Sequence, residues 1–267
     1  MQQLTNPVKE RLGKGELAIG MGVRGLRGVE VARLMKSAGF DWLFIDLEHG
    51  SASVETACQI AVAALDAGIA PLVRVPAGEL ALGARCLDGG ALGIVIPHVD
   101  TPEQARAMVD AFRFPPLGHR SIGGAYPHFG FASRPVSEVV SGLDNATLVV
   151  AMIETPIAVE NADRIAAVPG LDVLLVGTND LSLEMGIPGQ LDHERVKVAL
   201  NAVLNACKKH GKIPALGGIY GRELLTRYLG LGFRMMLAGN DISLLHSAAQ
   251  EQARFVRGLS GTPSLQK

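Results

Sequence analysis

The stretch "SAGFDWLFIDLEHG", residues 37–50, contains the pattern that decides the fold. A glycine just past a helix relieves the left-handed position at which helices end, so Gly39 marks a helix that stops before a strand. The apolar run 41–46 has the composition of a buried strand, and ionisable side chains follow it directly. A buried strand that ends in carboxylates and a histidine needs a functional explanation.

This unit of a short aliphatic run followed by a helix-length amphipathic stretch recurs along the chain, which is the signature of βα units around a parallel sheet. Eight such units favour a closed (β/α)₈ TIM barrel over an open sheet. We predict a single α/β domain over residues 1–267. The predicted strands are 17–23, 41–46, 71–75, 92–96, 148–153, 172–177, 213–217 and 233–239.

The bulk composition narrows the class of protein. The 267 residues are 48% hydrophobic, enough for one large core, and the net charge of -1 lacks the basic excess that nucleic acid or an anionic membrane requires. The longest apolar run, near 146–153, is far shorter than the roughly 20 residues of a membrane span. The N-terminal stretch has no apolar core of a signal peptide, so we expect a cytoplasmic protein. The three cysteines form no CxxC pair and are expected to be reduced thiols.

Reactive side chains gather at four predicted strand ends, where a barrel places its chemistry. His49 follows the second strand, Arg74 lies in the third, Glu154 ends the fifth and Asp180 follows the sixth. A lone carboxylate after a strand is most often a helix cap, and Asp180 alone fits that reading. An unpaired guanidinium in a buried strand is costly, so Arg74 is harder to explain structurally. Their joint placement favours an active site.

The residue types indicate metal-assisted chemistry on an oxo acid. Glu154 and Asp180 can coordinate one hard divalent cation, Mg²⁺ or Mn²⁺ with Co²⁺ as a substitute, because no thiolate or histidine pair accompanies them. Such an ion polarises a 2-oxo acid, and Arg74 can donate to the enolate oxygen. His49 has a pKa range suited to proton exchange near neutral pH; its alternative role is to hold the loop by hydrogen bonds.

Six motifs occur in order along the chain: "FDWLFIDLEHG", "LVRVP", "GGALGIVIPHV", "FPPLGHRSIGG", "MIETP" and "VGTNDLS". Together they resemble the HpcH/HpaI family of metal-dependent class II pyruvate aldolases, over about residues 16–257. The resemblance implies that Glu154 and Asp180 bind the metal, His49 is the catalytic base, Arg74 stabilises the pyruvate enolate and Asp88 pairs with the histidine.

The resemblance also implies a reaction and an assembly. A 4-hydroxy-2-oxo acid would lose its 4-hydroxyl proton and split into pyruvate, or hydroxypyruvate, and an aldehyde. The last helix of the barrel would be exchanged between subunits of a hexamer built as a trimer of dimers. The long segment 113–134, rich in Gly, Pro and aromatic residues, is a candidate active-site loop in which Arg120 and Ser121 read the aldehyde.

One position departs from the family pattern. Two residues before the metal glutamate many members have a glutamine that contacts the oxo acid, and this chain has Met152. Methionine offers no amide donor, so the grip on the substrate is expected to differ. The backbone amides of Asn179 and Asp180 are expected to bind the substrate carboxylate, and Asn179 stands where some members have alanine.

Three alternative functions stay open. A lyase of the CitE or malyl-CoA type shares the metal and the enolate but must accommodate coenzyme A. A catalytically silent barrel would serve as a binding protein, against which the intact polar set argues. A phosphate-binding barrel enzyme would use a glycine-rich loop such as 216–222, which fits an ordinary strand-to-helix turn better.

Overall fold

A computed structural model describes residues 4–259 and contains a closed barrel of parallel strands in the order β1 to β8. Each predicted strand is present, and its ends agree with the prediction to within two residues, which confirms the TIM-barrel fold. The strands are β1 (Ala18–Val23), β2 (Trp42–Asp46), β3 (Ala70–Arg74), β4 (Gly93–Ile96), β5 (Leu148–Ile153), β6 (Val173–Gly177), β7 (Ile213–Gly217) and β8 (Met235–Asn240).

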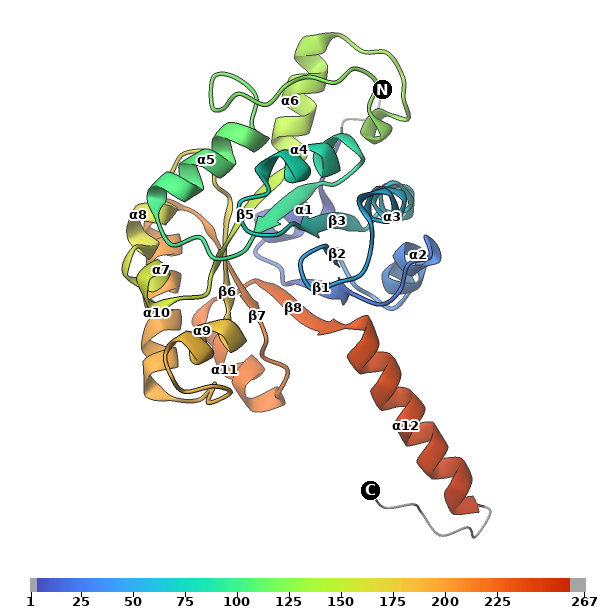
Figure 1. Cartoon of the computed structure of the whole chain (residues 1–267), viewed down its shortest axis with the longest axis vertical. Helices are drawn as coiled ribbons and strands as arrows, with labels where there is room; N and C mark the ends of the chain where they lie inside the picture. Colours follow the sequence, from blue (N-terminus) through green and yellow to red (C-terminus); the bar gives the residue numbers. More distant parts are fainter. Residues whose placement is uncertain (1–3, 260–267) are drawn as a thin grey trace.

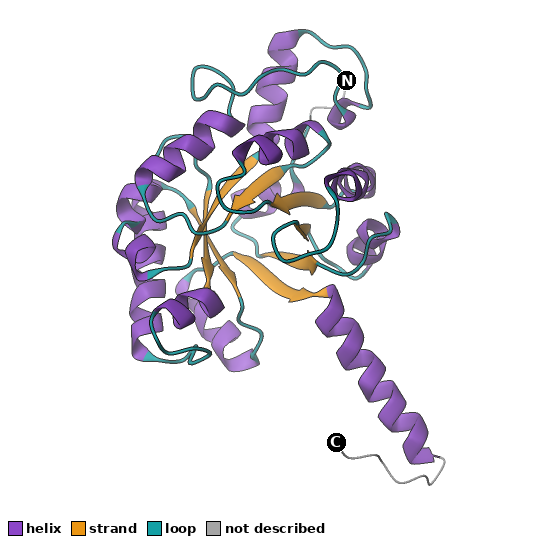
Figure 2. Ribbon diagram, in the orientation of Figure 1, coloured by secondary structure: helices purple, strands orange, loops and turns teal. Residues whose placement is uncertain are grey.

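Helices surround the barrel on its outer side, as Figures 1 and 2 show. They are α1 (Pro7–Gly13), α2 (Glu30–Ser37), α3 (Val54–Ala67), α4 (Leu80–Asp88), α5 (Pro102–Phe112), α6 (Val136–Ala146), α7 (Pro156–Glu160), α8 (Ala162–Ala166), α9 (Thr178–Glu184), α10 (Glu194–His210), α11 (Arg222–Leu231) and α12 (Asp241–Leu259), with a 3₁₀ turn η1 at Pro127–Phe129.

The core has two layers because side chains of a strand alternate between its faces. Trp42 and Phe44 belong to the cluster inside the barrel, whereas Leu43 and Ile45 belong to the cluster between the strands and the helices. Gly20 on β1 makes room for the indole, since a Cβ there would lie 2.1 Å from the Trp42 ring. Parallel strands buried on both faces explain the near-continuous apolar runs of the sequence.

The segment 113–134 lies at the N-terminal end of the barrel and does not line the cavity at the other end of its own chain, so a single chain does not support the prediction that it is an active-site loop. It follows a helix, α5, and leads through α6 to the start of β5, whereas active-site loops follow strands. Arg113 binds Asp172, the residue directly before β6. Figure 1 shows α6 on the outside of the molecule, beyond α4 and α5.

The last helix, α12, leaves the barrel and points away from it, as Figure 1 shows. Asp241 is its one buried residue, and apolar side chains such as Leu245, Phe255 and Leu259 are exposed. Within residues 4–259 no helix combines the length and the apolar character needed to cross a membrane.

Candidate active site

A cavity of about 180 Å³ opens at the carboxyl ends of the strands. Its lining residues come from β1 to β3 and β5 to β8 or from the segments directly after them. Three side chains predicted from the sequence, Arg74, Glu154 and Asp180, line it together, and Met152 and Asn179 line it as well. The strand-end residues therefore converge on one pocket.

Arg74, the last residue of β3, is held by Asp46, the last residue of β2. The two are direct partners in the sheet register, and Arg74 donates from Nε to Oδ1 at 3.0 Å and from Nη2 to Oδ2 at 2.6 Å. Its side chain is 4% exposed, and the guanidinium carbon lies 5.0 Å from the centre of the Phe44 ring. This bidentate pair fixes the guanidinium plane against the pocket.

Asp46 is a structural partner that the sequence reading did not include among the site residues. Burial would raise the pKa of its carboxyl, but the hydrogen bonds and charge of Arg74 outweigh burial and hold the pKa below its usual value. Asp46 also accepts hydrogen bonds from the backbone of Glu48 and His49, both at 3.1 Å. One carboxylate thus positions the arginine and the loop that carries the histidine.

His49 lies in the loop after β2 with 57% of its side chain exposed, and it is not among the residues that line the cavity. Its Nε2 lies 3.8 Å from Oε2 of Glu48. The same Glu48 oxygen lies 2.9 Å from Nη1 of Arg74, without the alignment of a hydrogen bond. His49 therefore faces solvent beside the pocket.

Glu154 follows β5 and is 1% exposed, yet its Oε1 has no hydrogen-bond partner among the described residues. Its Oε2 accepts from the backbone N–H of His98 at 3.1 Å. Burial raises the pKa of Glu154 to about 7; the negative charge of Asp180 adds to this, and His98 opposes it. A buried carboxylate with a free oxygen is costly unless a counter-charge binds it.

Asp180 and Asn179 lie in the first turn of α9, directly after β6. The turn is held by Thr178, which donates to the carbonyl of Gly217 at 2.9 Å. Gly177 allows Glu154 to approach, since a Cβ at this position would lie 2.3 Å from the carboxylate oxygen. The glycine before α9 thus makes room for the buried glutamate.

The donor set fits a hard divalent cation. Glu154 offers an unpartnered buried oxygen, Asp180 lines the same cavity, and neither a thiolate nor a lysine lines it. Within residues 4–259 no cluster of three or more His, Cys, Asp or Glu side chains could enclose an ion. The other coordination positions would then be available to water and substrate oxygens, as in catalytic rather than structural sites.

Asp88 does not meet His49 within one chain. It is the last residue of α4, the helix that leads back to the start of β4, and its carboxylate accepts from Nη2 of Arg120 at 2.9 Å. Arg120 is buried and stacks on Phe114, so it is a structural partner here and does not read a substrate in its own chain's pocket. The predicted pairing of Asp88 with His49 has no contact that supports it within a single chain.

Met152 takes a place beside Arg74. Its sulfur lies 3.9 Å from Nη1 of that arginine, where a glutamine amide would have offered stronger polar contacts. The sequence reading also missed Arg24, which lines the cavity and donates from Nε to Oδ2 of Asp46 at 2.9 Å. His98 was missed too; it has a positive φ of 51°, uncommon outside glycine.

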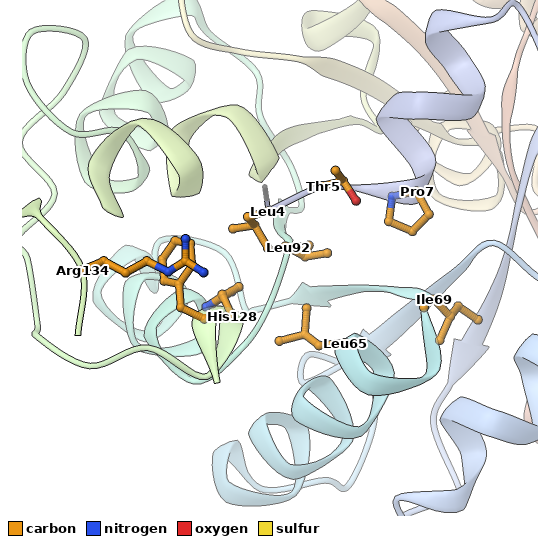
Figure 3. A pocket seen from close by; sticks show the side chains of 10 residues that line it. Leu4, Thr5, Pro7, Leu65, Ile69, Leu92, His128 and Arg134 are labelled. Atoms are coloured by element: carbon orange, nitrogen blue, oxygen red, sulfur yellow. The ribbon is translucent and has the colours of Figure 1, made fainter. Parts of the chain in front are cut away.

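A larger cavity of about 420 Å³ lies at the opposite end of the barrel, and Figure 3 shows its lining. Leu65, Ile69 and Leu92 form much of its wall, with His128 and Arg134 on one side. None of the described residues that line it carries a carboxylate, so residues 4–259 offer no ligands for a divalent cation there. Size alone therefore does not identify the reactive pocket.

Comparison with known proteins agrees with this geometry. The model of the HpcH/HpaI aldolase/citrate lyase family matches residues 27–248. The chain is 42% identical to 4-hydroxy-4-methyl-2-oxoglutarate aldolase tasA of Hapsidospora irregularis, over 95% of this chain and 96% of that protein. It is 35% identical to a hydroxypyruvate/pyruvate aldolase of Pseudomonas aeruginosa, over 97% and 96%.

Among solved structures, the HpcH/HpaI aldolase of Desulfitobacterium hafniense superposes with a TM-score of 0.89 at 28% identity, covering 97% of this chain and 98% of that one. The matches span almost the whole chain, and the named relatives are aldolases. The chain therefore belongs to the HpcH/HpaI aldolase/citrate lyase family and is a carbon–carbon lyase.

Proposed function

We propose that the protein is a divalent-metal-dependent aldolase that reversibly cleaves a 4-hydroxy-2-oxo acid to pyruvate, or hydroxypyruvate, and a carbonyl compound. The observation that carries the proposal is the buried, unpartnered Oε1 of Glu154 in the cavity that Asp180 and Arg74 also line. Glu154 and Asp180 would hold Mg²⁺ or Mn²⁺, with Co²⁺ as a substitute. When bound, such an ion withdraws electrons from the keto group of the oxo acid.

The residues of the chain account for the remaining charge changes. As the bond between C3 and C4 breaks, its electron pair moves into the enolate of pyruvate, and Arg74 donates to the enolate oxygen. Because Asp46 already fixes the guanidinium, little reorganisation is needed at that moment. The N–H groups of Asn179 and Asp180 lie in the first turn of α9, where backbone donors lack partners within the helix, and they bind the substrate carboxylate.

His49 accepts the proton of the 4-hydroxyl group and lies within a loop held by Asp46. Protonation of the enolate at C3 then releases pyruvate, which balances the proton that was removed. No lysine is among the lining residues of the described pocket, so a Schiff base has no nucleophile there.

We propose 4-hydroxy-4-methyl-2-oxoglutarate as a substrate, because the relative tasA is named for its cleavage. Cleavage of this acid gives two molecules of pyruvate. Hydroxypyruvate as the nucleophile is the second choice, in line with the name of the Pseudomonas aeruginosa relative. A cavity of about 180 Å³ suits an acid of this size.

The test is metal removal. Protein treated with EDTA is expected to lose pyruvate formation from 4-hydroxy-4-methyl-2-oxoglutarate and to regain it with Mg²⁺, Mn²⁺ or Co²⁺, measured with a lactate dehydrogenase assay for pyruvate. Full activity in chelator, combined with inactivation by borohydride in the presence of pyruvate, would identify a lysine enzyme and overturn the proposal.

The assembly is part of the same proposal. We propose that a second copy of the chain covers α12 by helix exchange, in a hexamer, because large apolar side chains along that helix, such as Leu245, Phe255 and Leu259, are exposed in a single chain. The exposed His49 would then receive Asp88 from a neighbouring copy, since the two lie apart within one chain.

Mixing two inactive variants tests this arrangement. His49→Ala and Asp88→Ala are each expected to be slow, and hybrids formed by unfolding and refolding them together should recover part of the activity. If both variants form oligomers of wild-type size and their hybrids stay as slow as the parents, Asp88 does not act across an interface.

A further inference from the structure

The pocket is lined by two arginines, and they differ in how many of their donors are in use. Arg74 is 4% exposed, binds Asp46 through Nε and Nη2, and has Glu48 beside Nη1. Arg24 binds Asp46 through Nε alone, and its side chain is 39% exposed. No hydrogen bond among residues 4–259 uses either Nη nitrogen of Arg24, so a pair of donors is available at the pocket.

Arg24 is held in place rather than free on the surface. The backbone N–H groups of Arg24, Gly25 and Leu26 all donate to the carboxylate of Asp241, at 3.1, 2.9 and 2.7 Å respectively. Asp241 is buried at the start of α12. Asp241 thus fixes the backbone of Arg24, and Asp46 fixes its Nε. Because the side chain is already held, less conformational entropy is lost when the guanidinium binds a ligand.

The two guanidinium groups share one anchor. Oδ2 of Asp46 accepts from Nε of Arg24 and from Nη2 of Arg74, so the two side chains lie next to each other at the pocket wall. In the proposed reaction Arg74 serves the keto-acid end of the substrate. Arg24 is the other cationic side chain among the described lining residues. Arg24 is therefore the side chain that could serve as the counter-charge of a second anionic group on the substrate.

The wall around Arg24 is polar. Tyr220 and Asn240 line the same part of the pocket, and the positive charge of Arg24 acts on the Tyr220 phenol, whose pKa burial raises. The Oδ1 atom of Asn240 accepts from the backbone of Ser243 at 2.9 Å, which leaves its amide N–H₂ free to donate. At Gly217, which also lines the pocket, a Cβ would be in ordinary van der Waals contact with Leu237 at 3.7 Å.

We propose that Arg24 binds the second carboxylate of the substrate, the one carried by the carbonyl half that is released with pyruvate. The enzyme then selects oxo acids over neutral aldehydes as the acceptor in the synthetic direction. This inference rests on the proposed aldolase function and adds a specificity residue to it. A carboxylate fits the two parallel N–H donors of a guanidinium, whereas a neutral aldehyde leaves them unpaired.

Two acids of equal length test the recognition apart from catalysis. 2-Oxoglutarate and 2-oxopentanoate differ only in the group at C5, and their dissociation constants are measured by calorimetry on Mg²⁺-loaded protein. The wild type is expected to bind 2-oxoglutarate roughly 10- to 100-fold more tightly, the effect of one charge-assisted bidentate contact. Arg24→Gln should bring the two constants together, and Arg24→Lys should keep part of the preference.

Arg27→Gln is the matched control, because Arg27 lies in the same loop, contacts Ser51 and does not line the pocket. It should keep the wild-type preference. Equal binding of the two acids by the wild type, or an Arg24→Gln protein that still prefers the diacid, overturns the inference. If Arg24→Gln does not fold, equal binding by the wild type still overturns the inference, and Arg24→Lys is the variant in which the preference should be reduced.

Turnover separates this inference from the proposed function. With pyruvate as nucleophile, Arg24→Gln should raise KM for glyoxylate roughly 10- to 100-fold and change kcat/KM for acetaldehyde by less than about threefold. An equal loss with both acceptors would mean that Arg24 only positions Asp46 and Arg74. A wild type that joins pyruvate to neither acceptor contradicts the aldolase function itself.

Discussion

At each end of the barrel a buried arginine is bound by an aspartate, but the two arginines differ in whether a guanidinium donor is left without a protein acceptor. Arg113, at the N-terminal end, donates to the carbonyls of Gly170, Asp144 and Thr147 and to the carboxylate of Asp172. Arg74, at the C-terminal end, directs Nη1 only at Met152 and the misaligned Glu48.

The difference teaches how one residue type serves two purposes. A guanidinium whose donors all meet protein acceptors joins segments and stabilises the fold, whereas one with a donor left over can bind a substrate. Glu154 repeats the pattern among the acids: one oxygen is bound by His98, and the other has no described partner. Buried donors without a partner also occur at the N-terminal end, on Arg120 and Arg134. Among the described residues, an unpartnered carboxylate oxygen beside an arginine donor is therefore what distinguishes the reactive end.

The largest expected effect concerns two carboxylates, the buried Glu154 and the half-buried Asp172. Glu154→Gln should reduce turnover at least about 10³-fold and abolish Mg²⁺ binding, because it removes a metal ligand. It should leave the thermal midpoint equal or higher, since the costly buried charge is gone. Asp172→Asn should do the reverse and lower the midpoint while kcat changes little. Steady-state kinetics and calorimetry measure both, and a Glu154→Gln enzyme with wild-type turnover would refute the metal assignment.

The two arginines provide the next contrast. Arg74→Ala should lower kcat roughly 10²- to 10³-fold through the loss of one preorganised donor to the enolate. Arg113→Ala should leave kcat near wild type but cost about 1 to 3 kcal/mol in the free energy of unfolding, because buried carbonyls lose their donor. Lys9 and the N–H of Val149 would still bind Asp172. Denaturant titration gives the second value. If Arg74→Ala changed KM alone, that arginine would act only in ground-state binding of the substrate.

A glycine pair sharpens the steric side of the comparison. Gly177→Ala should weaken Mg²⁺ binding and lower turnover roughly 10- to 100-fold, because the new Cβ would lie 2.3 Å from Oε1 of Glu154. Gly230→Ala makes the same chemical change inside α11, where a Cβ meets nothing within 4 Å. It should keep wild-type turnover and gain about 0.5 to 1 kcal/mol. Equal turnover in both variants would remove Gly177 from the site.

The smallest effect at neutral pH concerns the N-terminal cavity, because it appears only in acid. Burial lowers the pKa of His128 to about 4, while an unfolded histidine titrates near 6.5. Between about pH 4 and pH 6.5 the unfolded chain therefore binds more protons at His128 than the folded chain does. The part of the free energy of unfolding that depends on this residue is complete above about pH 6.5 and declines as the pH falls towards 4. His128→Gln should flatten the pH dependence of unfolding there by up to roughly 3 kcal/mol. Parallel curves for both proteins would show that folding does not lower the pKa of His128.

The fold was predictable because its signals are local and repeated. Aliphatic runs separated by helix-ending glycines such as Gly39 and Gly68 place each strand in the chain, and both glycines have positive φ. The convergence of Arg74, Glu154 and Asp180 followed from the rule that parallel strands end on one face. These inferences need only the order of the elements.

What was missed depends on contacts between distant segments. The loop 113–134 was assigned to the active site from its composition, although its place after a helix puts it at the opposite end. Asp46 was recognisable in principle, because it and Arg74 both end neighbouring strands. Arg24 was not, since its position depends on Asp241, which is 217 residues away along the chain. The predicted partnership of Asp88 with His49 could not be assessed from one chain's sequence.

The start of α12 has a consequence for dilute solutions. Asp241 fastens the loop of Arg24 to a helix whose large apolar side chains are exposed, and a 19-residue helix has little stability by itself in water. If neighbouring copies cover that helix, the midpoint of thermal unfolding depends on protein concentration. Dissociation would then loosen the anchor of Arg24, so the preference for acidic acceptors would fade on dilution before the chain itself unfolds.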